Sequence, residues 1–258
     1  PGMLGFLHGL RADGPPDTVL RPLRPAWWRL EPEEAPMPSY RRARRLGARV
    51  QLVVSDSYGY PLNGWKGRGV PWENGWRPWE AHVRALARRY KGKAVVWDVW
   101  NEPDARDWNV GQFWSGTRAQ FFEAYARAYR VLRQELGPDA PIGGPSFANY
   151  EPRDLAAFLA FCQREGLEVN ALSWHELKAA DDDIPAIADH LAAMRALAGR
   201  YPALRIRQLL VNETVGPKAR LSPGDALGIL RALERGGADG AMRACWEDSR
   251  GRNECFNG

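Results

Sequence analysis

The strongest constraint on the fold is a repeating order of short apolar runs and longer amphipathic segments. Strand-like runs occupy residues 3–8, 26–30, 48–55, 94–100, 141–144, 171–175, 207–212 and 240–246. The clearest helical patterns cover residues 79–90, 117–136, 152–165, 184–199 and 223–236. Units of this kind in series favour a closed α/β barrel, the (β/α)₈ TIM barrel, over an open doubly wound sheet. No GxGxxG follows the first run, so the dinucleotide-binding alternative lacks its main support.

The length of the chain fits one such barrel. At 258 residues we expect a single catalytic barrel domain over residues 1–258. The segment 247–258 carries no helical pattern. The eighth helix is therefore expected to be missing or truncated, unless the natural chain continues or the seam is covered differently.

The charge balance argues against a nucleic-acid partner. The formal net charge is +5, but the basic residues are dispersed over helix-like segments. The densest cluster, residues 41–45, is expected to be a solvated helix face. No apolar run approaches the roughly 18 to 20 residues that span a bilayer. The 12 tryptophans suit stacking on sugars, although Trp also fills ordinary cores.

Cysteine and histidine usage predicts neither a metal nor a cofactor. Cys245 and Cys255 lie close enough in sequence to pair, whereas Cys162 is expected free on a helix. Such a pair would favour an extracellular or periplasmic location over a cytoplasmic one. The four histidines, at positions 8, 82, 175 and 190, offer no paired ligand spacing. A monomer is favoured.

Two glutamates stand where apolar strands end. Glu102 follows the run Val-Trp-Asp-Val-Trp-Asn and precedes Pro103, and Glu213 follows Leu-Leu-Val-Asn. These are the fourth and seventh strands, whose carboxyl ends can face each other across a barrel mouth. Barrel enzymes keep their catalytic groups at that end. A salt bridge at the top of the barrel is the alternative for each glutamate.

A pair of carboxyl groups in this arrangement suits glycoside hydrolysis with retention of configuration. That reaction needs the two groups about 5 Å apart. One carboxyl must stay protonated to assist the leaving group, so its pKa must be raised by burial or by a negative neighbour. The other must stay ionised to attack the anomeric carbon.

The segment Trp100-Asn101-Glu102-Pro103 resembles the acid/base motif of the clan A glycoside hydrolases, most closely family 39 and its unclassified relatives. The likeness runs from about residue 79 to residue 246. It implies a retaining hydrolase of β-glycosidic bonds in oligo- or polysaccharides, with Glu102 as acid/base and Glu213 as nucleophile. The family commonly shows Thr before the nucleophile, where this chain has Asn212. Further agreement lies at residues 79–90, Ile142-Gly143-Gly144-Pro145, Ser173-Trp174-His175 and Asn212-Glu213.

The resemblance implies roles for four more residues. Asn101 would hydrogen-bond the 2-hydroxyl of the sugar in the cleaved subsite, and Arg29 would donate to the nucleophile and keep it ionised. His175 would lie close to the nucleophile, and Trp246 would form an aromatic platform beneath the sugar. Arg29 could instead pair with Glu31, and Trp246 could simply fill the top of the barrel.

Several residues near the expected site have weaker support. The long connection 55–78 is placed on the catalytic face, because a loop of that length in a compact domain is usually functional. Within it, Asp56 and Tyr58 could touch substrate hydroxyls, and Trp72 could stack on distal sugars or hold its own loop. His8, at the end of the first strand, could line the pocket or cap a loop.

Alternatives to this function also remain open. A transglycosylase would use the same residues, and a carbohydrate-binding barrel could have lost turnover. Glu176 and Glu247 also lie at strand ends, so they are rival carboxylates if the strand register differs.

Overall fold

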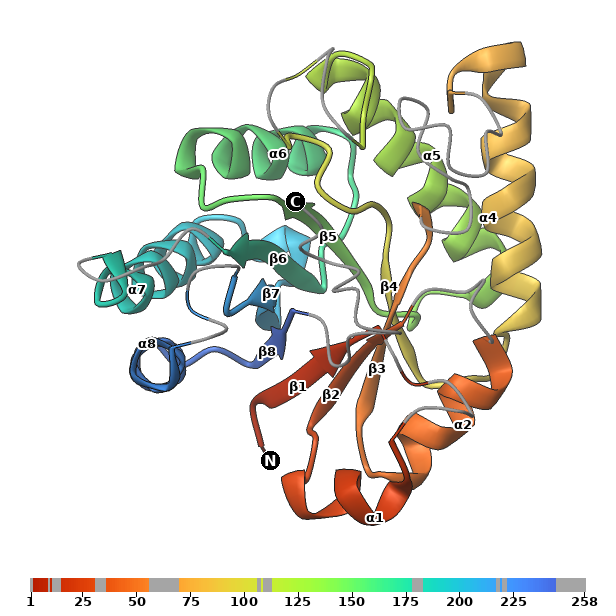
Figure 1. Ribbon diagram of the computed structural model, residues 1–258. Helices are drawn as coiled ribbons and strands as arrows, with labels where there is room; N and C mark the ends of the chain where they lie inside the picture. The colour runs from red at the N-terminus through yellow and green to blue at the C-terminus, as the bar shows by residue number, and fades with distance from the viewer. Residues whose placement is uncertain are drawn as a thin grey trace.

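In the described part of the chain, eight parallel strands close into a barrel in the computed structural model (Figure 1). Each strand pairs with the next along the chain, and the last pairs with the first through Gly5 and Met242. The strands are β1 (Leu4–Leu7), β2 (Trp27–Leu30), β3 (Arg49–Val53), β4 (Val95–Asp98), β5 (Ile142–Phe147), β6 (Ala171–Glu176), β7 (Gln208–Thr214) and β8 (Gly240–Arg243). The predicted (β/α)₈ barrel is therefore confirmed.

Helices surround the barrel between successive strands (Figure 1). They are α1 (Asp17–Leu20), α2 (Pro36–Arg45), α4 (Arg77–Arg89), α5 (Arg118–Leu136), α6 (Pro152–Arg164), α7 (Ala186–Gly199) and α8 (Pro223–Arg235), with 3₁₀ turns at Arg21–Leu23, Glu73–Trp76 and Pro202–Leu204. The structure describes residues 2–8, 10, 15–30, 36–55, 70–105, 108, 113–177, 183–216, 219 and 222–244. The expectation about a helix after β8, the pairing of Cys245 with Cys255 and most of the 55–78 connection lie outside these residues.

The longest helix begins where its sequence predicts. The Thr117 hydroxyl accepts from the backbone N–H of Gln120, and the Gln120 side chain accepts from the backbone N–H of Thr117. This reciprocal capping box satisfies two donors that the first turn of α5 leaves open. Ser222 caps α8 in a similar way by accepting from the N–H of Asp225.

The interior of the barrel is built in two layers. The lower layer is an apolar cluster separate from the larger core between strands and helices, and it includes Trp27, Val96, Ala171, Leu210 and Met242. Two residues further along four of these strands come the side chains that we call the upper layer: Arg29, Asp98, Ser173 and Asn212. Because side chains alternate across a strand, residues two apart point the same way.

A tryptophan fills the lower layer of the barrel. The ring of Trp27 is fully buried, and its Nε1 donates to the carbonyl of Asp239 at 3.0 Å. Strand β8 leaves room for it across the barrel interior, since a Cβ on Gly240 would lie 2.5 Å from Trp27 Nε1. The Arg49 guanidinium lies over the ring at 4.0 Å from its centre.

Two sequence expectations need correction. Strand β5 does not end at residue 144 but continues through Pro145 to Phe147, and its pairing with β6 shifts register between these two residues. Proline and glycine punctuate many strands, but a register shift here accommodates the residue without an N–H donor. In the 41–45 cluster, Arg42 is buried and pairs with Asp17 at 2.7 Å, so only part of that cluster is a solvated face.

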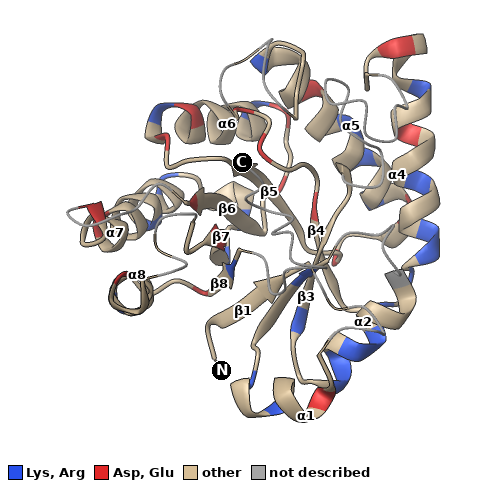
Figure 2. Cartoon of the chain, in the orientation of Figure 1, with Lys and Arg blue, Asp and Glu red and all other residues tan. Residues whose placement is uncertain are grey.

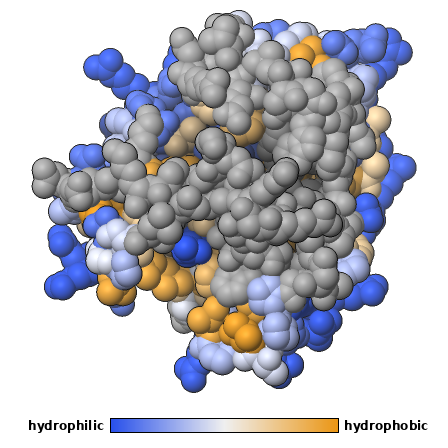
Figure 3. All heavy atoms as spheres, viewed as in Figure 1, coloured by the Kyte–Doolittle hydropathy of each residue, from blue (hydrophilic) through white to orange (hydrophobic). Residues whose placement is uncertain are grey.

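Charged residues lie mainly on the helices outside the barrel, with basic segments recurring along α2 and α4 (Figure 2). In the space-filling view, hydrophobic residues reach the described surface only in small separate areas (Figure 3). None of the helices in the described ranges has both the length and the apolar character to cross a bilayer.

Candidate active site

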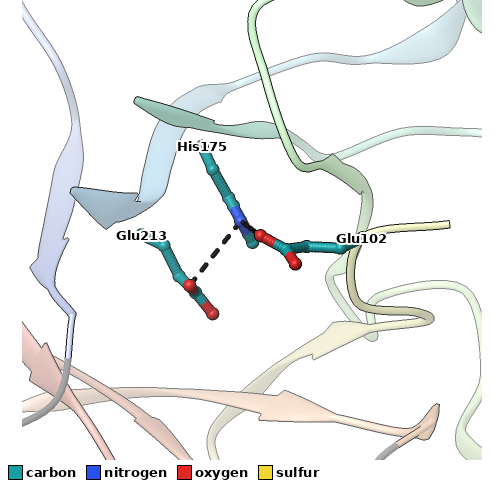
Figure 4. Close-up of side chains that lie close together, drawn as sticks. All are labelled: Glu102, His175 and Glu213. Atoms are coloured by element: carbon teal, nitrogen blue, oxygen red, sulfur yellow. Dashed lines mark hydrogen bonds and ion pairs between the residues drawn. The ribbon is translucent and has the colours of Figure 1, made fainter. Parts of the chain in front are cut away.

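Glu102, from the turn after β4, converges above the upper layer with His175 of β6 and Glu213 of β7 (Figure 4). His175 Nδ1 lies 2.8 Å from Glu102 Oε1 and 3.7 Å from Glu213 Oε2. One carboxylate oxygen of each glutamate and a ring nitrogen of His175 all lie within 4.8 Å of one another. The two glutamates that the sequence singled out therefore meet at the barrel mouth.

The backbone at Glu102 adopts an uncommon conformation. Its φ is +47°, in the left-handed region that residues other than glycine rarely occupy. The turn is held on both sides, since the Glu102 N–H donates to the carbonyl of Ser146 at 2.9 Å and its own carbonyl accepts from Ala105. Strained conformations of this kind persist where surrounding contacts over-determine them, and they cluster at functional sites.

One buried arginine, Arg29, donates hydrogen bonds to three residues of the site. Arg29, in β2, is 1% exposed, and its Nη1 donates to Glu213 Oε1 at 2.8 Å. Its Nε and Nη2 donate to Asp98 Oδ2 at 3.0 and 2.8 Å. Nη2 also donates to Asn101 Oδ1 at 2.8 Å. The expected contact between Arg29 and Glu213 is thus present, whereas the alternative partner Glu31 lies outside the described residues.

Asp98 and its neighbours belong to this site, and sequence reasoning missed them. The Asp98 carboxylate is fully buried and accepts from Ser146 Oγ at 2.6 Å and from Asn212 Nδ2 at 3.1 Å. Asn212 Nδ2 also donates to Ser146 Oγ at 2.8 Å, and Ser146 Oγ lies 2.9 Å from Ser173 Oγ. The available signal was an acidic residue at an inward position of an apolar strand, two residues after Val96.

Burial separates the proton affinities of the groups at the site. It raises the pKa of Glu102 to about 7, although the nearby Arg29 opposes the shift. It lowers the pKa of His175 to about 4, against the attraction of Glu213, so the imidazole is neutral near pH 7. Burial also raises the pKa of Asp104 to about 7, while its hydrogen bond from the Ala148 N–H opposes that rise.

The remaining candidates occupy different places. The backbone N–H of Asn101 donates to Ser55 Oγ at 3.1 Å, so both its backbone and its side-chain oxygen are fixed. His8 follows β1, and its carbonyl accepts from Trp28 Nε1. Trp72 packs edge-on against Trp114 at 5.2 Å between ring centres, within an aromatic cluster. Asp56, Tyr58 and Trp246 lie outside the described residues.

The rival carboxylate in β6 has other partners. Glu176 Oε1 accepts from Trp174 Nε1 at 2.8 Å and lies 2.9 Å from His190 Nδ1 in α7. Its side chain is therefore engaged outside the barrel interior. The other rival, Glu247, is not among the described residues.

Among the described residues, Glu102, His175 and Glu213 have ligand atoms that lie close enough together to share a metal ion. Their chemistry, two carboxylates and one imidazole, is compatible with a divalent cation. It is equally suited to proton transfer, because the pKa of Glu102 is raised to about 7 and the imidazole is neutral near that pH.

The sequence profile of glycosyl hydrolases family 39 matches residues 70–214. This is more than half of the 258 residues, and the chain belongs to that family. A β-xylosidase of Geobacillus stearothermophilus is 30% identical over 118 residues, which are 43% of this chain and 22% of that protein. The expected likeness to clan A glycoside hydrolases, most closely family 39, is confirmed.

Solved structures share the barrel. N2152 from Neocallimastix frontalis matches with a TM-score of 0.70 at 22% identity, over 94% of this chain and 60% of that one. A glucosidase from Croceicoccus marinus matches with a TM-score of 0.70 at 19% identity, over 98% and 62%. The endo-1,4-β-D-mannanase of Thermotoga petrophila matches with a TM-score of 0.63 at 13% identity, over 99% and 94%. This chain thus spans less than two thirds of the first two proteins.

Proposed function

We propose that this protein is a retaining glycoside hydrolase that cleaves β-glycosidic bonds in an oligo- or polysaccharide by double displacement. Glu102 serves as acid/base, and Glu213 serves as nucleophile. The observation that carries the proposal is the approach of the two carboxylates, with one oxygen of each within 4.8 Å of the other. This spacing suits direct attack on the sugar, whereas an inverting enzyme separates its carboxyl groups by about 6.5–9.5 Å to admit a water.

The surroundings of the two glutamates suit these different roles. Glu102 lies in a buried turn that raises its pKa to about 7, so it can hold a proton for the leaving oxygen. Glu213 accepts a charge-assisted hydrogen bond from Arg29, which orients the carboxylate that attacks the anomeric carbon. In the second step Glu102 takes a proton from water, which then releases the sugar from Glu213.

Asn101 fits the sugar-binding role expected of it. Its Oδ1 is occupied by Arg29 Nη2, which orients the side-chain amide. The amide nitrogen is then the group that remains to donate to a substrate hydroxyl. The names of the proteins with which this chain shares its family or fold, a β-xylosidase, a glucosidase and a mannanase, make β-linked sugars the first substrates to test.

The test is covalent labelling with dinitrophenyl 2-deoxy-2-fluoro-β-xyloside and the corresponding glucoside. The fluorine slows the second displacement, so we expect a glycosyl adduct on Glu213, identified by mass spectrometry of the digested protein. Glu213→Ala should take up no label and should lose turnover. Azide should partly restore turnover to this variant, with an α-glycosyl azide as product. Labelling of another carboxylate, or a product of inverted configuration from the unaltered enzyme, would contradict the proposal.

A further inference from the structure

We propose that Asp98 is a positioning residue that aims Arg29 at the nucleophile. This inference rests on the proposed function, since it assigns Arg29 the task of orienting Glu213 for attack. Asp98 contacts neither glutamate in the described structure. It acts instead through the guanidinium group of Arg29, which contacts both Asp98 and Glu213.

Hydrogen bonds from three other strands hold the Asp98 carboxylate in place. It is fully buried in β4 and accepts four hydrogen bonds, two of them from Arg29. Ser146 and Asn212 supply the other two, from β5 and β7. A buried carboxylate is costly unless paired and hydrogen-bonded, and here each oxygen has a donor.

Because the guanidinium of Arg29 is planar, its contacts with Asp98 also determine how it meets the active site. Arg29 presents Nε and Nη2 to one oxygen of Asp98, and this edge fixes the plane of the whole group. Once the plane is fixed, Nη1 points to Glu213 Oε1, and Nη2 also reaches Asn101 Oδ1. One contact with Asp98 therefore sets the direction of both the nucleophile and the sugar-binding amide.

Asn212 gains an explanation from the same geometry. This residue departs from the Thr common at its position, and its Nδ2 donates to both Asp98 and Ser146. The side chain immediately before Glu213 thus holds the carboxylate that orients Arg29. Among the described residues, Asn212 Oδ1 has no hydrogen-bond partner, so the amide nitrogen carries the contact.

The experiment measures inactivation rates with the same dinitrophenyl 2-fluoro glycosides. Their leaving group needs no proton, so the maximal rate of inactivation reports attack by Glu213 rather than acid catalysis. Asp98→Asn keeps the size of the side chain but removes its charge. We expect the maximal rate to fall on the order of 100-fold, because small misplacements of reacting groups have effects of that size. The half-saturating concentration should change little, because the fluorine replaces the 2-hydroxyl that Asn101 is expected to bind.

Two further variants separate positioning from stability. Ser146→Ala removes one donor to Asp98 and should slow inactivation in the same direction by a smaller factor, which provides a test even if Asp98→Asn fails to fold. Glu176→Gln is the matched control, a buried carboxylate in β6 whose described side-chain partners are Trp174 and His190. It should react at the rate of the unaltered protein.

The outcomes distinguish this inference from the proposed function. A labelled parent protein with unchanged rates in folded Asp98→Asn and Ser146→Ala overturns the role of Asp98 alone. Equal slowing in Glu176→Gln also overturns it, because the effect would then be a general loss of structure. A parent protein that no fluoro glycoside labels overturns the proposed function, and the role of Asp98 falls with it.

Discussion

The lower and upper layers of the barrel interior come from the same strands but have opposite chemistry. Trp27 and Arg29 are successive inward residues of β2, and Val96 and Asp98 are successive inward residues of β4. The lower residues fill space and stabilise the barrel, whereas the upper ones form ion pairs beneath the glutamates. Over a distance of two residues along each strand, the interior therefore changes from a core into the base of a site.

The largest expected effect is on turnover and comes from substitution of Glu102, which lies above the upper layer. Glu102→Ala should lower turnover of unactivated glycosides by about 10²–10⁴-fold, because their leaving groups need a proton. Dinitrophenyl glycosides should lose far less in the first step, since their leaving groups depart without protonation. Steady-state and pre-steady-state rates on both substrates measure the difference. Equal losses in that step on both would remove Glu102 from the acid role.

The lower layer should respond in stability instead. Trp27→Ala leaves a cavity in the barrel and removes the hydrogen bond to the carbonyl of Asp239. We expect the free energy of unfolding to fall by about 3–5 kcal/mol, measured by urea denaturation. The fraction that remains folded should keep most of its inactivation rate with the fluoro glycosides. A loss of rate as large as that of Asp98→Asn would show that the layers are not separable.

The smallest effect is the dependence of stability on pH. Folding raises the pKa of Glu102 from 4.5 to about 7, so the folded chain binds an extra proton between these values. The resulting stabilisation is complete below about pH 4.5 and is lost as the pH rises towards 7. Glu102→Gln lacks this proton, so its free energy of unfolding should rise relative to the parent by about 1–3 kcal/mol between pH 5 and pH 8.

Urea titrations of both proteins at the two pH values measure this difference. His175 contributes with the opposite sign, because its lowered pKa of about 4 costs stability as the pH falls below 6.5. Both proteins contain His175, which lies 2.8 Å from Glu102 in the parent, so its contribution cancels in large part and the remaining change with pH is assigned to Glu102. A difference in the free energy of unfolding between the two proteins that stays constant with pH would contradict the raised pKa of Glu102.

Much of the fold was predictable because the barrel repeats one simple pattern. Short apolar runs gave all eight strands, and the end of the fourth run placed Glu102 at the barrel mouth. Strand β5 was predicted too short, because Gly144 and Pro145 resemble a strand end. Local sequence does not show that a neighbouring strand shifts its register to accommodate them.

The site was predictable at its rim and less so at its base. Glu102 follows β4 and Glu213 is the next-to-last residue of β7, positions with chemical meaning in any barrel, and a motif supported one of them. Asp98 lies inside the apolar run predicted as the fourth strand, where a single acid gives little hint of its partners. Ser146 contacts both Asp98 and Ser173 where β5 and β6 are adjacent and irregular, an arrangement that depends on tertiary structure.

The contacts of Arg29 also make formation of the site depend on complete assembly of the barrel. Arg29 lies in β2 and its ion-pair partners lie in β4 and β7, strands that are far apart in sequence and are brought together only when the barrel closes. In a partly assembled chain, the guanidinium of Arg29 and the carboxylates of Asp98 and Glu213 would lie in an apolar interior without their ion-pair partners. Completion of the barrel and the appearance of a reactive nucleophile are therefore expected to be one event, so an incompletely folded molecule should not bind covalently to sugar.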